Sequence, residues 1–235
     1  MHVRDFTAEM ELIAPPSLAE EFDAGRIGLI VEGAPEIHTV CCALDATPGV
    51  VRAALDAKAD MLVVHHTPIW TPLTALVGPT ASLMRDILAG HLNVYAMHTN
   101  FDHAPGGVND ALAELLGLSG CSPLSLGLVG TCTLTLDEIA ARLGAPLRVW
   151  GECGAVKQLA VVAGSGFDPA IMAEARDLGA DAFLSAELKH SVARAAPLPC
   201  LESTHYALEA PAMKRLAVQR CWQYIDDTPK LRIVP

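Results

Sequence analysis

The strongest constraint on the fold of this 235-residue chain is a pattern that occurs twice: an apolar strand, a helix and a second apolar strand. In the first stretch these segments are TVCCALDA (39–46), TPGVVRAALDAKA (47–59) and DMLVVHH (60–66); in the second they are QLAVVAGSG (158–166), FDPAIMAEARDLGA (167–180) and DAFLSAE (181–187). Strands that are apolar throughout, rather than alternating, suit burial on both faces of a sheet. Each stretch therefore predicts a parallel strand–helix–strand unit.

The two units also share the step that joins the helix to the second strand. It reads Ala-Asp in both, ending at Asp60 and at Asp181, which indicates a weak internal repeat. We therefore predict an α/β fold of two related lobes, each with a mixed or parallel sheet flanked by helices. The boundaries predicted for the larger lobe are 1–123 plus 195–235, and the smaller lobe is predicted at 124–194.

The segments outside the repeat add further elements. A strand is predicted at 91–100, and helices are predicted at 108–118, 135–144 and 205–221. Thr135, followed three residues later by Glu138, has the capping-box pattern of a helix N-terminus. Pro211 lies inside the last helix and predicts an irregularity or kink there.

The chain is acidic, with 16 Lys and Arg against 27 Asp and Glu and a formal net charge of -11. No basic run offsets this charge, so we expect no binding to nucleic acid or to an anionic membrane. Binding of a phosphorylated small molecule remains compatible with this negative charge, because bound metal ions can supply positive charge locally. No run of about 18 apolar residues occurs, so no membrane span is expected.

The seven cysteines are odd in number and never form a C-x-x-C spacing. This usage favours reduced thiols over a disulfide framework or a zinc ribbon. The N-terminal segment MHVRDFTAEMELIAPP has charges where a signal peptide needs an apolar stretch. The sequence therefore predicts a soluble, cytoplasmic protein.

Two histidines close the apolar run 60–66. His65 and His66 stand just before Thr67-Pro68, which ends the predicted strand. Ligand sites in open parallel sheets lie at the carboxyl ends of strands. A turn at Pro68 would let both rings reach one site, although neighbouring strand residues point to opposite faces. The alternative is an ordinary pair of surface or loop histidines.

Two further segments offer imidazole and carboxylate groups. His98 and Asp102 follow the strand predicted at 91–100; Asp102 is a hard anionic ligand, and His98 is a candidate ligand or proton-transfer group. His205 and Glu209 are four residues apart, so on a helix they project from one face. The alternatives are a turn-capping role for Asp102 and a surface contact between His205 and Glu209.

The combination of the three segments predicts a metal centre. Mixed imidazole and carboxylate ligation suits Zn, Fe or Mn, and the absence of thiols argues against a structural zinc site. Five ligands that include two carboxylates exceed what one tetrahedral ion needs, and carboxylates can bridge. We therefore predict two divalent ions, bound in a cleft by His65, His66, Asp102, His205 and Glu209.

The sequence resembles the Nif-three-like dinuclear metal-centre hexameric proteins, often labelled GTP cyclohydrolase type 2-like, over nearly its whole length. The resemblance rests on ALDATPGVVRAALDAKADMLVVHHTPIW (43–70), HTNFDHAPGGVND (98–110), VVAGSG (161–166), GADAFLSAELKH (179–190) and THYALEAPAM (204–213). It implies the Nif-three-like fold, the same five metal ligands and a ring-shaped homohexamer. The segment 22–33 departs from the family pattern, with Arg26 and Ile27 where more polar residues are common.

Other polar residues leave more than one interpretation open. Glu187 ends the second repeat at the place equivalent to the two histidines of the first, so it is a candidate for proton transfer or an ordinary surface glutamate. His190 could pair with it or be a helix residue. The glycines at 164 and 166 could let backbone amides approach a phosphate, although a tight turn is the simpler explanation.

Two functions fit these patterns. In the first, a metal-dependent hydrolase, the ions lower the pKa of a bridging water and polarise a carbonyl, amidine or phosphoryl group. The family label implies opening of the guanine ring of GTP, a small-molecule nucleotide substrate. In the second, the chain is a non-catalytic metal-handling or regulatory hexameric scaffold.

Overall fold

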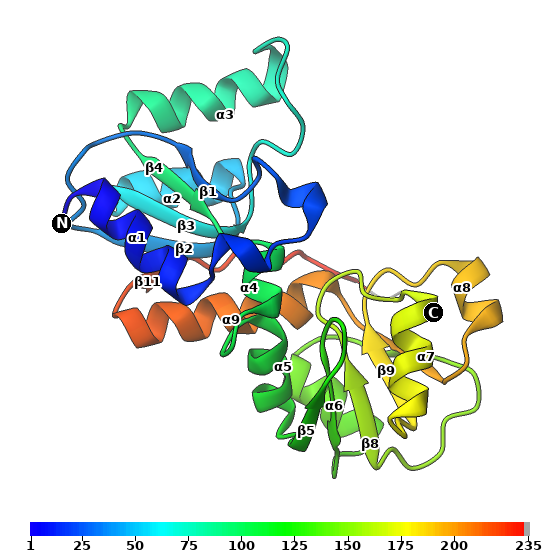
Figure 1. Ribbon diagram of the computed structural model, residues 1–235. Coiled ribbons are helices and arrows are strands. Elements are labelled where there is room, and N and C mark those ends of the chain that lie inside the picture. Colours follow the sequence, from blue (N-terminus) through cyan, green and yellow to red (C-terminus); the bar gives the residue numbers. More distant parts are fainter. Residues whose placement is uncertain (233–235) are drawn as a thin grey trace. The chain divides into compact units, whose positions relative to one another are not determined.

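The computed structural model describes residues 1–232 and divides into two compact α/β units (Figure 1). Unit 1 comprises residues 1–104 and the chain from residue 213 onward, and unit 2 comprises residues 105–212. The α/β fold class predicted from the sequence is confirmed.

Unit 1 contains a five-stranded sheet in the order β1-β4-β3-β2-β11. Its strands are β1 (Gly28–Val31), β2 (Val40–Asp45), β3 (Met61–His66), β4 (Asn93–Ala96) and β11 (Gln223–Tyr224). Strand β3 is parallel to both β2 and β4, and β11 is parallel to β2, whereas β1 is antiparallel to β4. The first repeat therefore forms the predicted parallel crossover.

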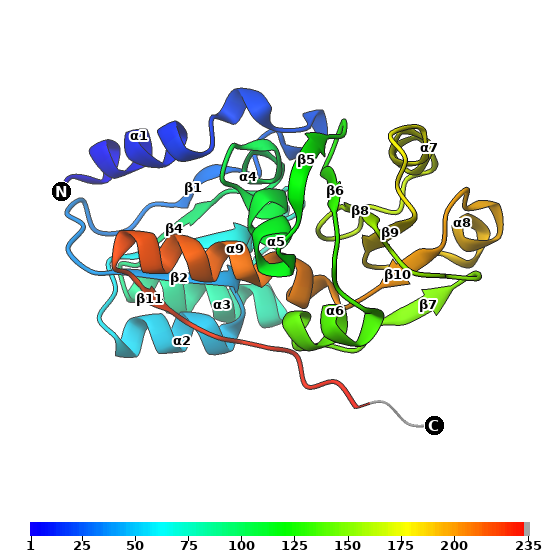
Figure 2. The ribbon, with the colours of Figure 1, turned by 90° about the horizontal axis from the view of Figure 1, so that it is seen from below.

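Helices cover both faces of the unit 1 sheet (Figures 1 and 2). They are α1 (Val3–Ile13), α2 (Pro48–Asp56), α3 (Gly78–Ala89), α4 (Thr99–His103) and the C-terminal part of α9 (His205–Arg220), with short 3-10 turns η1 (Pro16–Leu18) and η2 (Glu21–Asp23). Thr47 caps α2 by accepting a hydrogen bond from the amide of Val50, and Pro48 pre-sets the first helical residue.

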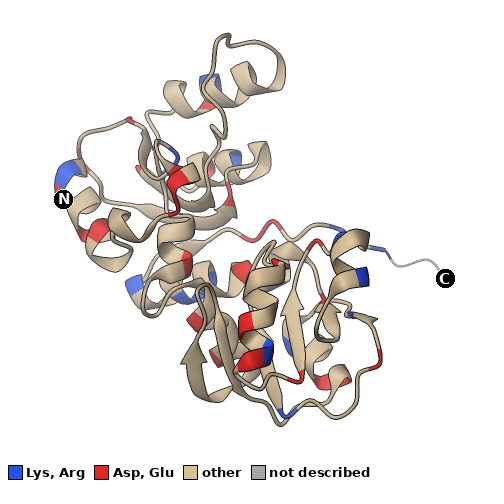
Figure 3. Ribbon diagram, turned by 45° about the vertical axis from the view of Figure 1, so that its right-hand side comes forward, with Lys and Arg blue, Asp and Glu red and all other residues tan. Residues whose placement is uncertain are grey.

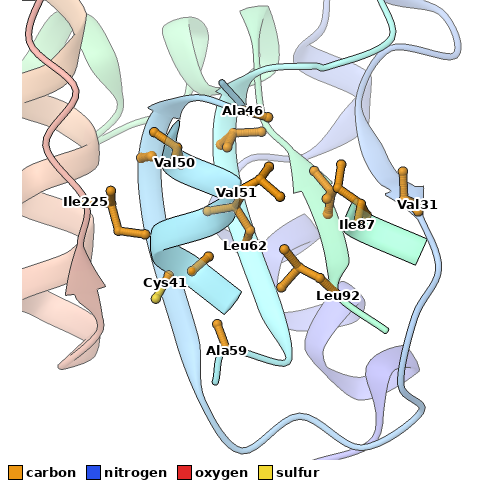
Figure 4. Close-up of a cluster of buried hydrophobic side chains, with 14 of the residues drawn as sticks. Val31, Cys41, Ala46, Val50, Val51, Ala59, Leu62, Ile87, Leu92 and Ile225 are labelled. Carbon is orange, nitrogen blue, oxygen red and sulfur yellow. The ribbon is translucent and has the colours of Figure 1, made fainter. Parts of the chain in front are cut away.

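The core of unit 1 lies between the sheet and helices α2 and α3 (Figure 4). Val51 of α2 and Ile87 of α3 are fully buried against Leu62 of β3. Cys41 packs into this core, whereas the Sγ of Cys42 points to the opposite face and donates to the carbonyl of Met213 at 3.4 Å. Both cysteines are buried and act as small apolar residues.

Unit 2 contains a six-stranded sheet in the order β5-β6-β8-β9-β10-β7. Its strands are β5 (Ser119–Pro123), β6 (Leu128–Thr131), β7 (Arg148–Trp150), β8 (Gln158–Val161), β9 (Ala182–Ser185) and β10 (Cys200–Glu202). Its helices are α5 (Val108–Leu116), α6 (Leu136–Leu143), α7 (Pro169–Asp177), α8 (His190–Ala195) and the N-terminal part of α9. Strands β8, β9 and β10 are parallel, and β5, β6 and β7 each add antiparallel pairing.

The boundaries of unit 2 are wider than those predicted for the smaller lobe. On the N-terminal side, β5 pairs with β6 and α5 contacts α6, so residues 105–123 join this unit. On the C-terminal side, β10 pairs with β9 and β7, so residues 195–212 join it as well. Long-range strand pairing decides both boundaries.

The internal repeat extends to individual hydrogen bonds. Asp60 Oδ2 accepts from the amides of His38 and Thr39, each at 2.9 Å. Asp181 Oδ2 accepts from the amides of Lys157 and Gln158, also at 2.9 Å. Each aspartate lies just before the second strand of its strand–helix–strand repeat. Its carboxylate therefore links that strand to the residues at the start of the first strand of the same repeat.

The sequence made one prediction about the start of helix α6 and one about Pro211 in helix α9. The capping box of α6 is present, with Thr135 accepting from the Glu138 amide and the Glu138 carboxylate accepting from the Thr135 amide. Helix α9 continues through Pro211.

None of the helices within residues 1–232 combines the length and hydropathy needed to cross a membrane. Acidic and basic residues are interspersed along the ribbon, without a long basic segment (Figure 3).

Candidate metal centre

His65 and His66 occupy the carboxyl end of β3, the central strand of unit 1. His65 is fully buried, and its Nδ1 lies 2.7 Å from the carbonyl oxygen of Met97. A carbonyl oxygen can only accept, so His65 Nδ1 bears the proton. In the neutral ring, Nε2 is then the atom with the lone pair.

Asp45 holds His66 in the same way. Its Oδ1 lies 2.7 Å from His66 Nδ1. The two residues are register partners at the ends of the parallel strands β2 and β3, so the sheet itself sets this contact. Asp45 was not among the residues predicted for the site; its position at the end of the first strand of the repeat is the signal that could have identified it.

His98 lies directly before α4 and contacts a fully buried carboxylate. The Nδ1 of His98 is 2.8 Å from Asp23 Oδ2, and Asp23 also accepts hydrogen bonds from the amide and hydroxyl of Thr99. Burial, followed by electrostatic interaction with His65 and His66, lowers the pKa of His98 to about 4, although Asp23 opposes the shift. His98 is therefore neutral at pH 7, with its lone pair on Nε2.

The three imidazoles of unit 1 converge on one point. His65, His66 and His98 each offer a ring nitrogen, and these three atoms lie within 4.8 Å of one another. Asp102 adds a carboxylate one helical turn after His98, with its Oδ1 3.7 Å from His65 Nε2. In the neutral ring, the lone pair of His65 Nε2 and the Asp102 oxygen are both electron-pair donors, and a cation between them would suit this geometry.

His205 and Glu209 form the corresponding group of unit 2, on the first turns of α9. His205 Nε2 lies 2.9 Å from Glu209 Oε2, and its Nδ1 lies 2.9 Å from Glu187 Oε1. Glu187 follows β9 with a φ of 62°, a strained conformation for a residue with a side chain. Its carboxylate contacts the His205 ring, and the role in proton transfer suggested by the sequence stays a prediction. His190 is exposed at the start of α8.

Gly164 makes room for the Glu209 carboxylate. Its φ is +65°, and a Cβ at this position would lie only 2.1 Å from Glu209 Oε1. The Gly164 carbonyl accepts hydrogen bonds from the Ala186 amide and the Ser185 hydroxyl. The absence of a side chain at Gly164 therefore allows the Glu209 carboxylate of α9 to lie close to this backbone.

The four histidines of the two donor groups make the same kind of contact. Each places its Nδ1 against an oxygen atom: Met97 O for His65, Asp45 for His66, Asp23 for His98 and Glu187 for His205. Histidines that bind metals through Nε2 are held in this way by carboxylates or carbonyls, which set the ring orientation and raise its basicity. The donor groups of both units therefore fit divalent metal ions.

The comparison with known families identifies the chain. The family profile Duf34/NIF3 (NGG1p interacting factor 3) matches residues 1–224. The chain belongs to the Duf34/NIF3 family. The resemblance seen in the sequence is therefore confirmed.

Two relatives each share about a third of their aligned residues with this chain. A Streptomyces coelicolor protein named GTP cyclohydrolase 1 type 2 homolog is 34% identical over 86% of this chain and 79% of its own length. A Pyrococcus horikoshii protein of the same name is 31% identical over 83% of this chain and 84% of its own length.

Solved structures of related proteins have the same fold. Reduced HcgD from Methanocaldococcus jannaschii is 26% identical, with a TM-score of 0.81 over 95% of this chain and 96% of that one. A hypothetical protein from Staphylococcus aureus is 24% identical, with a TM-score of 0.86 over 99% of both chains, which supports the fold alone. The Nif-three-like fold predicted from the sequence is therefore confirmed.

Proposed function

We propose that this chain is a metal-dependent hydrolase that binds two divalent ions. The proposed ligands are His65, His66, Asp102, His205 and Glu209. The observation that supports the proposal most directly is that the rings of His65, His66 and His205, and of the neighbouring His98, are each held through Nδ1, which leaves Nε2 as the ligand atom. Zn, Fe and Mn all accept this mixture of imidazole and carboxylate ligands.

Divalent ions at these residues would lower the pKa of a coordinated water and polarise the electrophilic group of a substrate. Asp102 would balance part of the ionic charge, and its position one turn after His98 keeps it beside the imidazoles. Asp45 and Glu187 would hold the rings of His66 and His205 in place. His98 is the candidate to accept a proton during hydrolysis, because its Nδ1 is engaged by Asp23 and its Nε2 bears the lone pair.

The names of the relatives suggest the substrate. The Streptomyces and Pyrococcus proteins are both named GTP cyclohydrolase 1 type 2 homolog, so we propose a nucleotide whose ring is opened by hydrolysis. We further propose a cytoplasmic homohexamer, as the family resemblance implies. Binding to nucleic acid is not expected for a chain with a net charge of -11.

The test combines metal analysis with a turnover assay. The chain is loaded in turn with Zn, Mn and Fe(II), its metal content is measured by mass spectrometry, and GTP conversion is followed by chromatography. We expect two ions per chain, multiple turnovers, and a turnover rate lower by roughly a hundredfold or more in Asp102→Ala. We expect His66→Ala to bind fewer than two ions while the fold, followed by circular dichroism, is retained.

Undiminished metal content in both variants would contradict the ligand assignment. Two bound ions without conversion of GTP under any metal would reject GTP as the substrate. One observation favours a second function: the family description names an interacting factor, so a non-catalytic, metal-stabilised partner of another protein is the alternative. In that case Asp102→Ala would lower thermal stability, and neither protein would turn over substrate.

A further inference from the structure

Two large aromatic side chains are exposed beside the imidazoles of unit 1. Trp70 follows the end of β3 and is 45% exposed, and Phe22 lies in η2 and is 53% exposed. The Trp70 ring centroid lies 5.1 Å from that of His98 at an interplanar angle of 89°, and the Phe22 centroid lies 6.2 Å from it at 71°. Both aromatic rings therefore flank the histidine that belongs to the candidate metal centre.

Arg26 is fixed on one of these rings. Its Cζ lies 5.1 Å from the Trp70 ring centroid, and its Nε donates to the Trp70 carbonyl oxygen at 2.7 Å. These two contacts to a single residue hold the guanidinium in one orientation. Its Nη1 and Nη2 groups supply the remaining donors of the planar fork that suits phosphate and carboxylate groups.

The charge of Arg26 is not neutralised by a neighbouring acidic side chain. Within residues 1–232, Arg26 forms no ion pair with a carboxylate, as is also true of other basic residues of the chain. A guanidinium is always charged at physiological pH. The structure therefore has a fixed cation, stacked on an exposed indole, next to three converging imidazoles.

We propose that Phe22, Arg26 and Trp70 form a binding wall for a flat heteroaromatic ring that bears an anionic group. The aromatic rings and the guanidinium plane stack on the ring of the ligand, since every such ring has a π-face. Arg26 binds the phosphate or carboxylate attached to it. This inference rests on the proposed function, because the wall directs such a ligand toward the imidazoles of His65, His66 and His98.

The proposal can be tested by binding measurements that do not depend on turnover. Isothermal titration calorimetry on the zinc-loaded chain compares four probes: GMP, guanosine, inorganic phosphate and orotate. GMP combines a ring with a phosphate, orotate combines a ring with a carboxylate, and the other two probes each supply one part. We expect GMP or orotate to bind more tightly than guanosine and inorganic phosphate. Comparing GMP with orotate shows whether the anionic group that binds is a phosphate or a carboxylate.

The variants separate the two parts of the wall. Arg26→Gln should weaken the anionic ring probe by roughly tenfold and leave guanosine unchanged, because a charged hydrogen bond is lost. Trp70→Leu should weaken both the anionic probe and guanosine by roughly tenfold through lost stacking, and Trp70→Phe should restore most of the affinity. Arg85→Gln on α3 removes the same charge from an exposed site elsewhere in unit 1, and it should leave all affinities unchanged.

Several outcomes would overturn the proposal without affecting the metal centre. The first is equal affinity of the anionic probe for the wild type, Arg26→Gln and Trp70→Leu, and the second is no binding of any probe to the wild type. A change in oligomeric mass in Trp70→Leu, with ligand affinity intact, would identify the exposed aromatics as a subunit contact instead. Metal content should match the wild type in every wall variant, so a failure of the proposed function is recognised separately by the loss of metal or turnover in the ligand variants.

Discussion

At the scale of single residues, the candidate centre depends on oxygen atoms that hold histidine rings. Asp23, Asp45 and Glu187 each contact an Nδ1 atom, and none of them was predicted to do so from the sequence. Asp23 is fully buried and binds both His98 and Thr99, so it also fixes the start of α4. These carboxylates set the ring orientations on which any metal site at these histidines depends.

Gly164→Ala tests the role of the close approach to Glu209. The new methyl group would lie 2.1 Å from Glu209 Oε1, at a backbone with a φ of +65°. We expect the Glu209 carboxylate to move, metal affinity to fall by roughly tenfold or more, and the free energy of unfolding to fall by about 2 kcal/mol. Metal titration and thermal unfolding of the variant measure both effects.

Gly179→Ala is the matched control, because its φ of +86° imposes the same kind of backbone strain but a Cβ there meets nothing within 4 Å. It should lower the free energy of unfolding by about 1 kcal/mol and leave metal affinity unchanged. If the two variants lose metal affinity equally, the contact with Glu209 is not the reason for the glycine at 164.

At the scale of elements, the repeated strand–helix–strand unit explains where the functional groups lie. The carboxyl end of β3 presents His65 and His66, and Glu187, which contacts His205, lies two residues after the end of β9. In parallel sheets this edge is where loops leave the strands and side chains are not used for packing. The same edge of each repeat therefore supplies polar groups to a donor set.

Asp60→Ala and Asp181→Ala test whether the equivalent aspartates stabilise their own repeats by the same amount. Each aspartate accepts two backbone hydrogen bonds at 2.9 Å in its own unit. Both sites are partly open to water, so we expect each variant to lower the free energy of unfolding by about 1 kcal/mol, measured by urea denaturation. Asp177→Asn, an exposed change at the end of α7, should have little effect. An effect of Asp60→Ala without one of Asp181→Ala would show that the equivalence is geometric only.

At the scale of the whole molecule, assembly is the property that the family resemblance predicts beyond one chain. We expect a homohexamer, with a mass by light scattering about six times the 24.8 kDa of a single chain. An oligomer of this kind would bury part of the exposed apolar surface, and its interface would add stability that depends on protein concentration. A monomeric mass at micromolar concentration would contradict the ring.

The sequence by itself determined the α/β class, the two parallel repeats and the family. Continuous apolar runs such as 60–66 and 158–161, each followed by a capped helix or a polar turn, are local patterns whose physical cause lies in the burial of both strand faces. The position of His65 and His66 at the end of such a run follows from the same local pattern. These features could be read from the chain because neighbouring residues decide them.

Only the tertiary structure decided which residues meet. Asp23 reaches His98 across 75 residues, and Asp45 reaches His66 because the register of β2 against β3 aligns them. The wall of Phe22, Arg26 and Trp70 likewise joins segments that are far apart in sequence. The sequence places Asp45 at the end of a strand, but its contact with His66, the strand order and the close approach at Gly164 depend on packing of the complete unit.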